Sequence, residues 1–179
     1  FQRGKHFIVT IQSSGNVGLW NTVTIGDDGL PIIAYESSQA LYVAQCDNIL
    51  CSSSSTSFVE STGVGNLHAS IIIGTDGLPL IGYRNSLDAT LKVAHCQTTA
   101  CTTSSTATLA NSGNVGLHTS IAVGTDGLGI LSYYDAISGD LEVAHCNNTS
   151  CSSAEVNSVD TSVDVGQYSA IAIGNDGLP

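Results

Sequence analysis

Six cysteines are the residues of this sequence whose spacing most restricts their chemistry. They form three pairs with four residues between the members of each: Cys46/Cys51, Cys96/Cys101 and Cys146/Cys151. An even, regular set of cysteines in a chain rich in Ser and Thr predicts disulfides made in an oxidising compartment. The sequence therefore predicts three local disulfides and a protein that is extracellular or exposed at the cell surface.

A histidine precedes two of these pairs, which leaves a metal site as the competing interpretation. His95 and His145 stand directly before Cys96 and Cys146, so that one imidazole and two thiolates could bind zinc. Gln45 replaces the histidine before the first pair, and no fourth ligand recurs at a fixed position. We therefore expect disulfides and no metal, with the two histidines hydrogen-bonded at strand ends.

Four flat, amphipathic rings recur at intervals of 48 or 50 residues: Trp20, His68, His118 and Tyr168. Rings that combine an apolar face with a polar edge either pack between structural units or form a platform on which a sugar stacks. Packing is the simpler interpretation of this position. Carbohydrate binding is the alternative.

Acidic and hydroxyl side chains offer weaker signals. Asp27-Asp28 and the pair Asp135 and Asp140 are candidate calcium ligands, but neither pair recurs in the other units, and calcium needs six to eight oxygens. The aspartates of the recurring Asp-Gly dipeptides are predicted to cap turns. No phosphate-binding loop, nucleophile elbow or helical metal motif occurs. We therefore predict no catalytic residue, no cofactor and no metal.

Hydroxyl-rich segments flank the third turn of each repeat, and the one between Cys146 and Cys151 contains two overlapping Asn-x-Ser/Thr sequons, at Asn147 and Asn148. A solvated edge strand explains the Ser and Thr residues. Glycosylation of either asparagine is the alternative.

The positions of all these residues are set by a repeat. Segment 67–79 returns as 117–129 and again as 167–179. A period in this range is typical of arrays in which each unit buries its apolar face against the next. We predict one array over 1–179, divided into these parts: a partial repeat 1–18, repeats 19–66, 67–116 and 117–166, and a partial repeat 167–179.

Each repeat is predicted to contain four short antiparallel strands. In the third repeat these are 118–124, 130–134, 141–146 and 154–159, with a turn at Asp126-Gly127 and no helical period. The first interval between equivalent positions is 48 residues and the later ones are 50. The difference predicts a two-residue deletion in the second turn of repeat one. Residues 7–11 are expected to form a fourth strand and 171–174 a first strand. The predicted fold is all-β with β-propeller-like blades, or alternatively an open β-solenoid or superhelical array.

Two motifs resemble a known group of repeats: Ser-Ile-x-(Ile/Val)-Gly-x-Asp-Gly-Leu-Pro and Leu-x-Val-Ala-His-Cys-x4-Cys. They are similar to the β-propeller repeats of large secreted or surface bacterial proteins, loosely grouped with sialidase-like propellers. The resemblance implies propeller blades. It does not extend to the sialidase Asp-box, because the only tryptophan, Trp20, lies at another position. Sialidase catalysis uses three arginines and this chain has two, so no sialidase active site is expected.

The charge of the chain restricts its partners. Fifteen acidic and four basic residues give a net charge of -11, which repels nucleic acid and anionic lipid. No apolar run approaches the ~20 residues of a membrane-spanning helix. We expect a non-catalytic structural protein, a surface scaffold or fibre-forming subunit that self-associates head-to-tail into a polymer or ring. The alternative is a lectin-like, carbohydrate-binding propeller module of a larger secreted protein.

Overall fold

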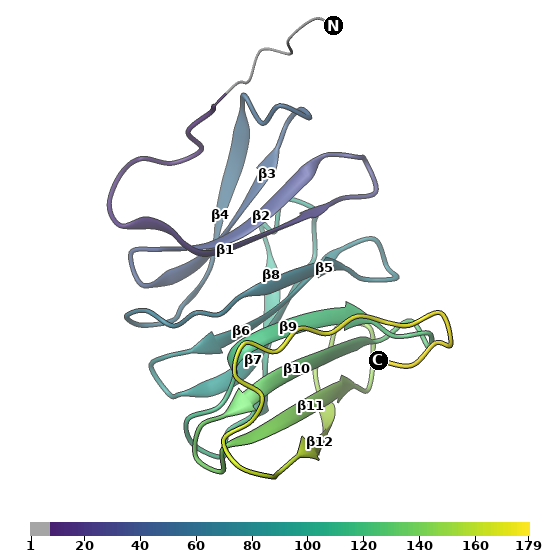
Figure 1. Ribbon diagram of the computed structural model, residues 1–179. Coiled ribbons are helices and arrows are strands. Elements are labelled where there is room, and N and C mark those ends of the chain that lie inside the picture. The colour runs from purple at the N-terminus through teal and green to yellow at the C-terminus, as the bar shows by residue number, and fades with distance from the viewer. Residues whose placement is uncertain (1–7) are drawn as a thin grey trace, which may run out of the picture.

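The computed structural model describes residues 8–179 as three four-stranded antiparallel sheets without a helix (Figure 1). The first contains β1 (Val17–Ile25), β2 (Pro31–Ser37), β3 (Ala40–Cys46) and β4 (Ser54–Ser61). The second contains β5 (Ser70–Ile73), β6 (Pro79–Asn85), β7 (Thr90–Cys96) and β8 (Ser104–Ala110). The third contains β9 (Leu117–Val123), β10 (Gly129–Asp135), β11 (Asp140–Cys146) and β12 (Ala154–Asp160). Within each sheet the strands pair in chain order. The predicted four-stranded antiparallel unit is confirmed.

Tight turns join the first two strands of each sheet. The Asp76 carboxylate accepts a hydrogen bond from Leu78 N at 3.1 Å, and the Asp126 carboxylate accepts one from Leu128 N at 3.0 Å. Gly127 has a φ of 81°, in the left-handed region where a side chain is strained. The predicted Asp-Gly turns are therefore present, capped by their own aspartates.

The second turn differs between repeats as the intervals predict. Two residues, Ser38 and Gln39, separate β2 from β3, whereas four separate β6 from β7 and β10 from β11. Both residues of the short turn have positive φ, 51° and 68°, which suits a tight hairpin between twisted strands. The missing residues thus shorten a loop and leave the strand register unchanged.

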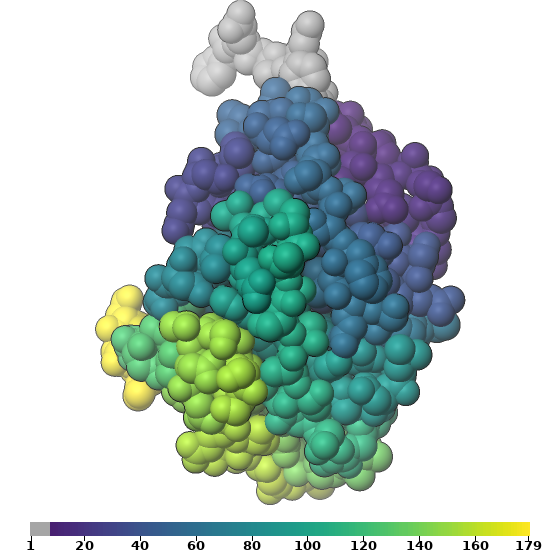
Figure 2. Space-filling view, turned by 180° about the vertical axis from the view of Figure 1, so that it is seen from behind, coloured from purple at the N-terminus to yellow at the C-terminus, as the bar shows by residue number. Residues whose placement is uncertain are grey.

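The sheets lie side by side, with the first strands β1, β5 and β9 adjacent to one another (Figure 1). In the space-filling view the blue first sheet, the teal second and the yellow-green third follow one another with little mixing (Figure 2). One apolar core lies between the first and second sheets and includes Leu41, Leu67, Ile71, Ile81 and Tyr83. The other lies between the second and third and includes Leu80, Leu91, Val115, Leu131 and Tyr133. Neighbouring sheets therefore bury apolar side chains against each other at two successive interfaces.

The expected end strands are not formed by the described residues. Phe7 lies outside the described part, and residues 8–12 form no strand, so β1 is the first strand. Residues 171–174 also form no strand, which corrects the second expectation. A strand needs a hydrogen-bonded partner along its backbone, and none of the described residues forms a hairpin with either segment.

The two end segments nevertheless occupy repeat positions. Ile171 N donates to Ser120 Oγ at 3.2 Å, and Ser169 Oγ donates to the His118 carbonyl at 3.1 Å, so the C-terminal segment runs beside β9 (Figure 1). It occupies the position that a further first strand would have.

The segment before β1 also occupies a repeat position, and its contacts are made by Gln12. Tyr35 OH donates to Gln12 Oε1 at 2.6 Å, and the Gln12 amide donates to Ser37 Oγ at 3.3 Å. Glu60, 48 residues later in β4, accepts hydrogen bonds from Tyr83 and Asn85 of the next sheet. Gln12 thus makes the contact of a preceding fourth strand although no strand is formed there.

The described residues include no helix long and apolar enough to cross a membrane.

Candidate functional site

The four recurring rings meet in the structure. Trp20 lies in β1 and His118 in β9, while His68 precedes β5 and Tyr168 precedes the segment beside β9. The ring centroids are 4.1 Å apart from Trp20 to His68, 4.6 Å from His68 to His118 and 4.1 Å from His118 to Tyr168. We call these four residues the aromatic row. Each sheet contributes one member, and the C-terminal segment contributes the last.

The backbone of the row is strained in every copy. The φ angles of Trp20, His68, His118 and Tyr168 are 51°, 43°, 56° and 57°. Left-handed backbone is uncommon for bulky residues and costs of order 1 kcal/mol or more at each. The pairing of β1 with β2 is also irregular beside Trp20, and that of β9 with β10 beside His118. The fold therefore maintains the same unfavourable geometry at four ring positions, as ligand-binding sites often do.

An open cavity of about 320 Å³ lies along the row. It is lined by the four rings and by the residue that follows each of them: Asn21, Ala69, Thr119 and Ser169. His68 is only 8% exposed, but Trp20 and Tyr168, at the two ends, are 40% and 81% exposed. The small neighbours leave the rings accessible and add amide and hydroxyl groups beside them.

The two imidazoles in the middle of the row are held in the neutral form. Burial, together with smaller repulsive contributions from His118 and Arg84, lowers the pKa of His68 to about 4. Burial also lowers the pKa of His118. Both rings therefore pack without carrying charge at neutral pH.

A second set of residues supports the row, and sequence analysis did not identify it. Glu36, Arg84 and Tyr134 follow the recurring tyrosines of the second strands. Each contacts the loop that leads into the next repeat: Gly65 N donates to Glu36 at 3.3 Å, Arg84 donates to Asn114 at 2.7 Å, and Tyr134 donates to Asp164 at 2.5 Å. Their position recurs but their chemistry changes, so a search for conserved residue types misses them.

The predicted disulfides lie at the other end of the sheets, beside the Asp-Gly turns. Cys46 is bonded to Cys51, Cys96 to Cys101 and Cys146 to Cys151, and no described cysteine is free. The metal alternative lacks thiolates, and the described residues contain no cluster of three metal-ligating side chains.

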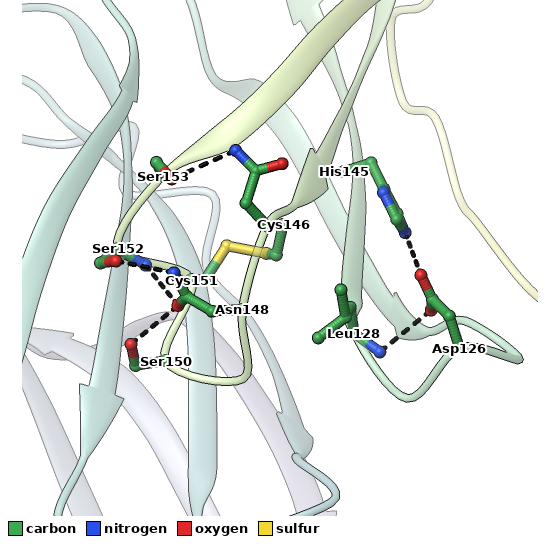
Figure 3. Close-up of a disulfide and its surroundings, with 10 residues drawn as sticks. Asp126, Leu128, His145, Cys146, Asn148, Ser150, Cys151, Ser152 and Ser153 are labelled. Carbon is green, nitrogen blue, oxygen red and sulfur yellow. Dashed lines mark hydrogen bonds and ion pairs between the residues drawn. A yellow bond between two sulfur atoms is a disulfide. The ribbon is translucent and has the colours of Figure 1, made fainter.

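His95 and His145 pair with aspartates of the turns. His145 Nε2 lies 2.9 Å from Asp126 (Figure 3). His95 Nε2 lies 2.7 Å from Asp76 in the second sheet. Gln45 donates to Asp28 at 3.3 Å in the first sheet. These contacts tie the end of each third strand to the first turn, far from the aromatic row.

The remaining candidates have local partners. Asp135 is buried and accepts hydrogen bonds from Ile137 N of its own turn at 2.7 Å and from Ser112 Oγ of the loop between β8 and β9 at 2.9 Å, so both of its carboxylate oxygens have partners within the protein. Asn148 caps the disulfide loop by accepting from Ser152 N at 3.1 Å (Figure 3). Asn147 is exposed, which makes it the more accessible sequon, and its glycosylation stays a prediction.

Comparison with known proteins identifies the fold type of this chain. No family model and no curated protein matches this chain. Among solved structures, a bifunctional GH43-CE protein from Bacteroides eggerthii matches with a TM-score of 0.52 and 12% identity, over 82% of this chain and 20% of that chain. The chain thus spans about a fifth of the matched protein. At this identity the similarity shows the fold alone, which is all-β and β-propeller-like, as predicted.

Proposed function

We propose that this chain is a non-catalytic, extracellular β-propeller-type module that binds carbohydrate along the aromatic row. The observation that carries the proposal is the row itself: four rings from successive repeats meet beside an open cavity, each on strained backbone. A sugar presents a flat C–H face to such rings and hydroxyl groups to their neighbours.

Packing alone does not account for the row. It explains His68, which is buried between Trp20 and His118. It does not explain why Trp20 and Tyr168 keep large exposed surfaces next to the cavity, since burying an aromatic ring is the main source of its packing energy. Exposed rings at both ends of the row are better suited to a ligand that lies across it.

The proposed module is non-catalytic because of the residues around the cavity. Hydrolysis of a glycosidic bond uses two carboxyl groups that flank the bond. No carboxylate lines the cavity along the row, and the nearby Glu36 is buried and hydrogen-bonded to Gly65. The three disulfides support a location outside the cell. A bacterial surface as that location is part of the same proposal.

A structural, self-associating role is the second candidate, and one observation favours it. Val23 and Ile25 of β1 are exposed, although they are the counterparts of Ile71 and Ile73 at the covered face of the second sheet. A sheet from another copy could cover this face. Carbohydrate binding ranks first because a head-to-tail array would also need a free surface beside β9, at the other end of the molecule. The C-terminal segment already occupies that surface through Ser169 and Ile171.

Affinity electrophoresis through gels that contain soluble polysaccharides tests the first proposal. The variant Trp20→Ala should weaken binding about fivefold, because a stacked ring contributes on the order of 1 kcal/mol. Phe58→Ala is the matched control, since Phe58 is an exposed ring on β4 outside the row. Equal retardation of Trp20→Ala and the wild type would contradict the proposal. Sedimentation velocity over a wide concentration range tests self-association.

A further inference from the structure

The described part of the chain contains two basic side chains, Arg84 and Lys92, and neither is available to a ligand. Arg84 is buried, and its guanidinium donates to Ser86 Oγ at 2.8 Å and to Asn114 Oδ1 at 2.7 Å. The Lys92 ammonium is paired with the Glu60 carboxylate. The described surface therefore offers no free lysine or arginine to a carboxylate or sulfate group.

Histidines do not replace these cations near the cavity. His68 and His118 are neutral at neutral pH because they are buried. His95 and His145 lie at the other end of the sheets, beside Asp76 and Asp126. The cavity wall is thus uncharged at neutral pH in a protein with a net charge of -11, whose field repels anions.

The polar groups along the cavity include both acceptors and donors. Thr119 Oγ1 donates its proton to the Gly116 carbonyl at 2.7 Å, and Ser169 Oγ donates its proton to the His118 carbonyl at 3.1 Å. A hydroxyl whose proton is already used can only accept from a ligand. Asn21 uses one N–H for the Gly18 carbonyl at 2.8 Å, which leaves its side-chain oxygen as an acceptor and its other N–H as a donor. The Trp20 indole N–H and the Tyr168 hydroxyl are further donors in the lining. These groups therefore match a ligand that both donates and accepts hydrogen bonds, as sugar hydroxyls do.

We infer that the aromatic row binds a neutral glycan and discriminates against glycans that carry uronic acid or sulfate groups. Sugar hydroxyls can donate to the three oxygens described above, whereas ionised carboxylate and sulfate groups only accept. An acidic group brought to the row would lose hydration without gaining a cation, in a protein whose net charge of -11 repels it. The inference rests on the proposed carbohydrate-binding function and names its ligand class.

Polymer pairs that share a backbone and differ in charge provide the test. We would compare hydroxyethyl with carboxymethyl cellulose, methyl-esterified pectin with polygalacturonate, and laminarin with its sulfated derivative, by affinity electrophoresis at pH 7. At least one neutral member should bind about tenfold more tightly than its acidic partner, and Trp20→Ala should abolish that difference. Stronger binding of an acidic member, lost in Trp20→Ala, would overturn the inference and leave the proposed function standing. No Trp20-dependent binding to any polymer would overturn both.

A charge placed in the cavity sharpens the test. Asn21 is exposed and lines the cavity, so Asn21→Lys introduces an ammonium there, and Asn21→Gln is the matched neutral control. Asn21→Lys should increase binding of the acidic members several-fold relative to Asn21→Gln. If the two variants bind acidic polymers equally, charge does not set the selectivity and the inference fails.

Discussion

The first and second sheets contain the same unit in two different surroundings. Leu19 and Leu67 occupy equivalent positions, yet Leu19 is 42% exposed and Leu67 only 1%. Val23 and Ile71 differ in the same way, at 61% and 6%. The second sheet is covered by the first, whereas among the described residues only the segment around Gln12 lies against the corresponding side of the first sheet. The repeat therefore determines which residue type stands at a position, whereas the neighbouring sheet determines whether that residue is buried.

This difference determines where the stability of the array comes from. In a repeat protein, each interface between units contributes separately to the free energy of folding. The apolar residues of the second sheet stabilise the protein through both of its interfaces, and those on the outer face of the first sheet do not. The next two experiments test that contrast, and a third tests the burial of His68 in the second repeat.

The largest expected effect is from truncation of the buried leucine. Leu67→Ala should lower the free energy of unfolding by about 3 kcal/mol, because it removes buried methyl groups and leaves a cavity between two sheets. Leu19→Ala, the same change at the equivalent exposed position, should cost less than about 1 kcal/mol. Urea denaturation followed by circular dichroism measures both. Equal losses would show that the face of the first sheet is covered in solution.

The disulfides extend the comparison to covalent stability. Cys101 and Cys151 are fully buried at interfaces between sheets, whereas Cys51 of the first sheet is half-buried. Loss of one five-residue loop closure should cost roughly 2 kcal/mol. Under mild reductant, Cys46–Cys51 should be reduced first because the reductant reaches its sulfur most easily. Timed alkylation and peptide mass spectrometry give the order, and earlier reduction of Cys96–Cys101 would contradict this prediction.

The last experiment in this series concerns pH. Because burial lowers the folded-state pKa of His68 to about 4, the unfolded chain, with a pKa near 6.5, binds the proton first as the pH falls. The contribution of neutral His68 is complete above about pH 6.5 and is lost progressively down to about pH 4.

The variant His68→Phe should flatten the dependence of stability on pH within that window. His145→Gln is the control, since His145 is half-exposed and lies outside the row. Chemical denaturation of the three proteins between pH 4 and 7 measures the effect. A wild-type profile that His68→Phe leaves unchanged would show that the ring is not held neutral by the fold.

Much of the fold was predictable because its signals are local. Alternating apolar residues and the Asp-Gly turns predict the four strands of each repeat, and the deletion between Tyr35 and Leu41 falls in a turn, as the intervals indicate. The end strands at 7–11 and 171–174 were wrong because a strand depends on a partner, and the repeat phase does not say whether that partner is present. Glu36, Arg84 and Tyr134 were missed because their contacts, and not their residue types, recur.

By itself the sequence determined the repeat, the strands and turns of each unit, the cysteine pairing and the set of four recurring rings. Each of these depends on residues that are close in the chain or that occupy the same position in successive repeats. Only the tertiary structure decided that the four rings touch, that His68 is buried while Tyr168 is exposed, and that no free lysine or arginine lies on the described surface. Distances between repeats, burial and pairing of charges depend on how whole sheets pack, and residues fifty positions apart do not encode that packing locally.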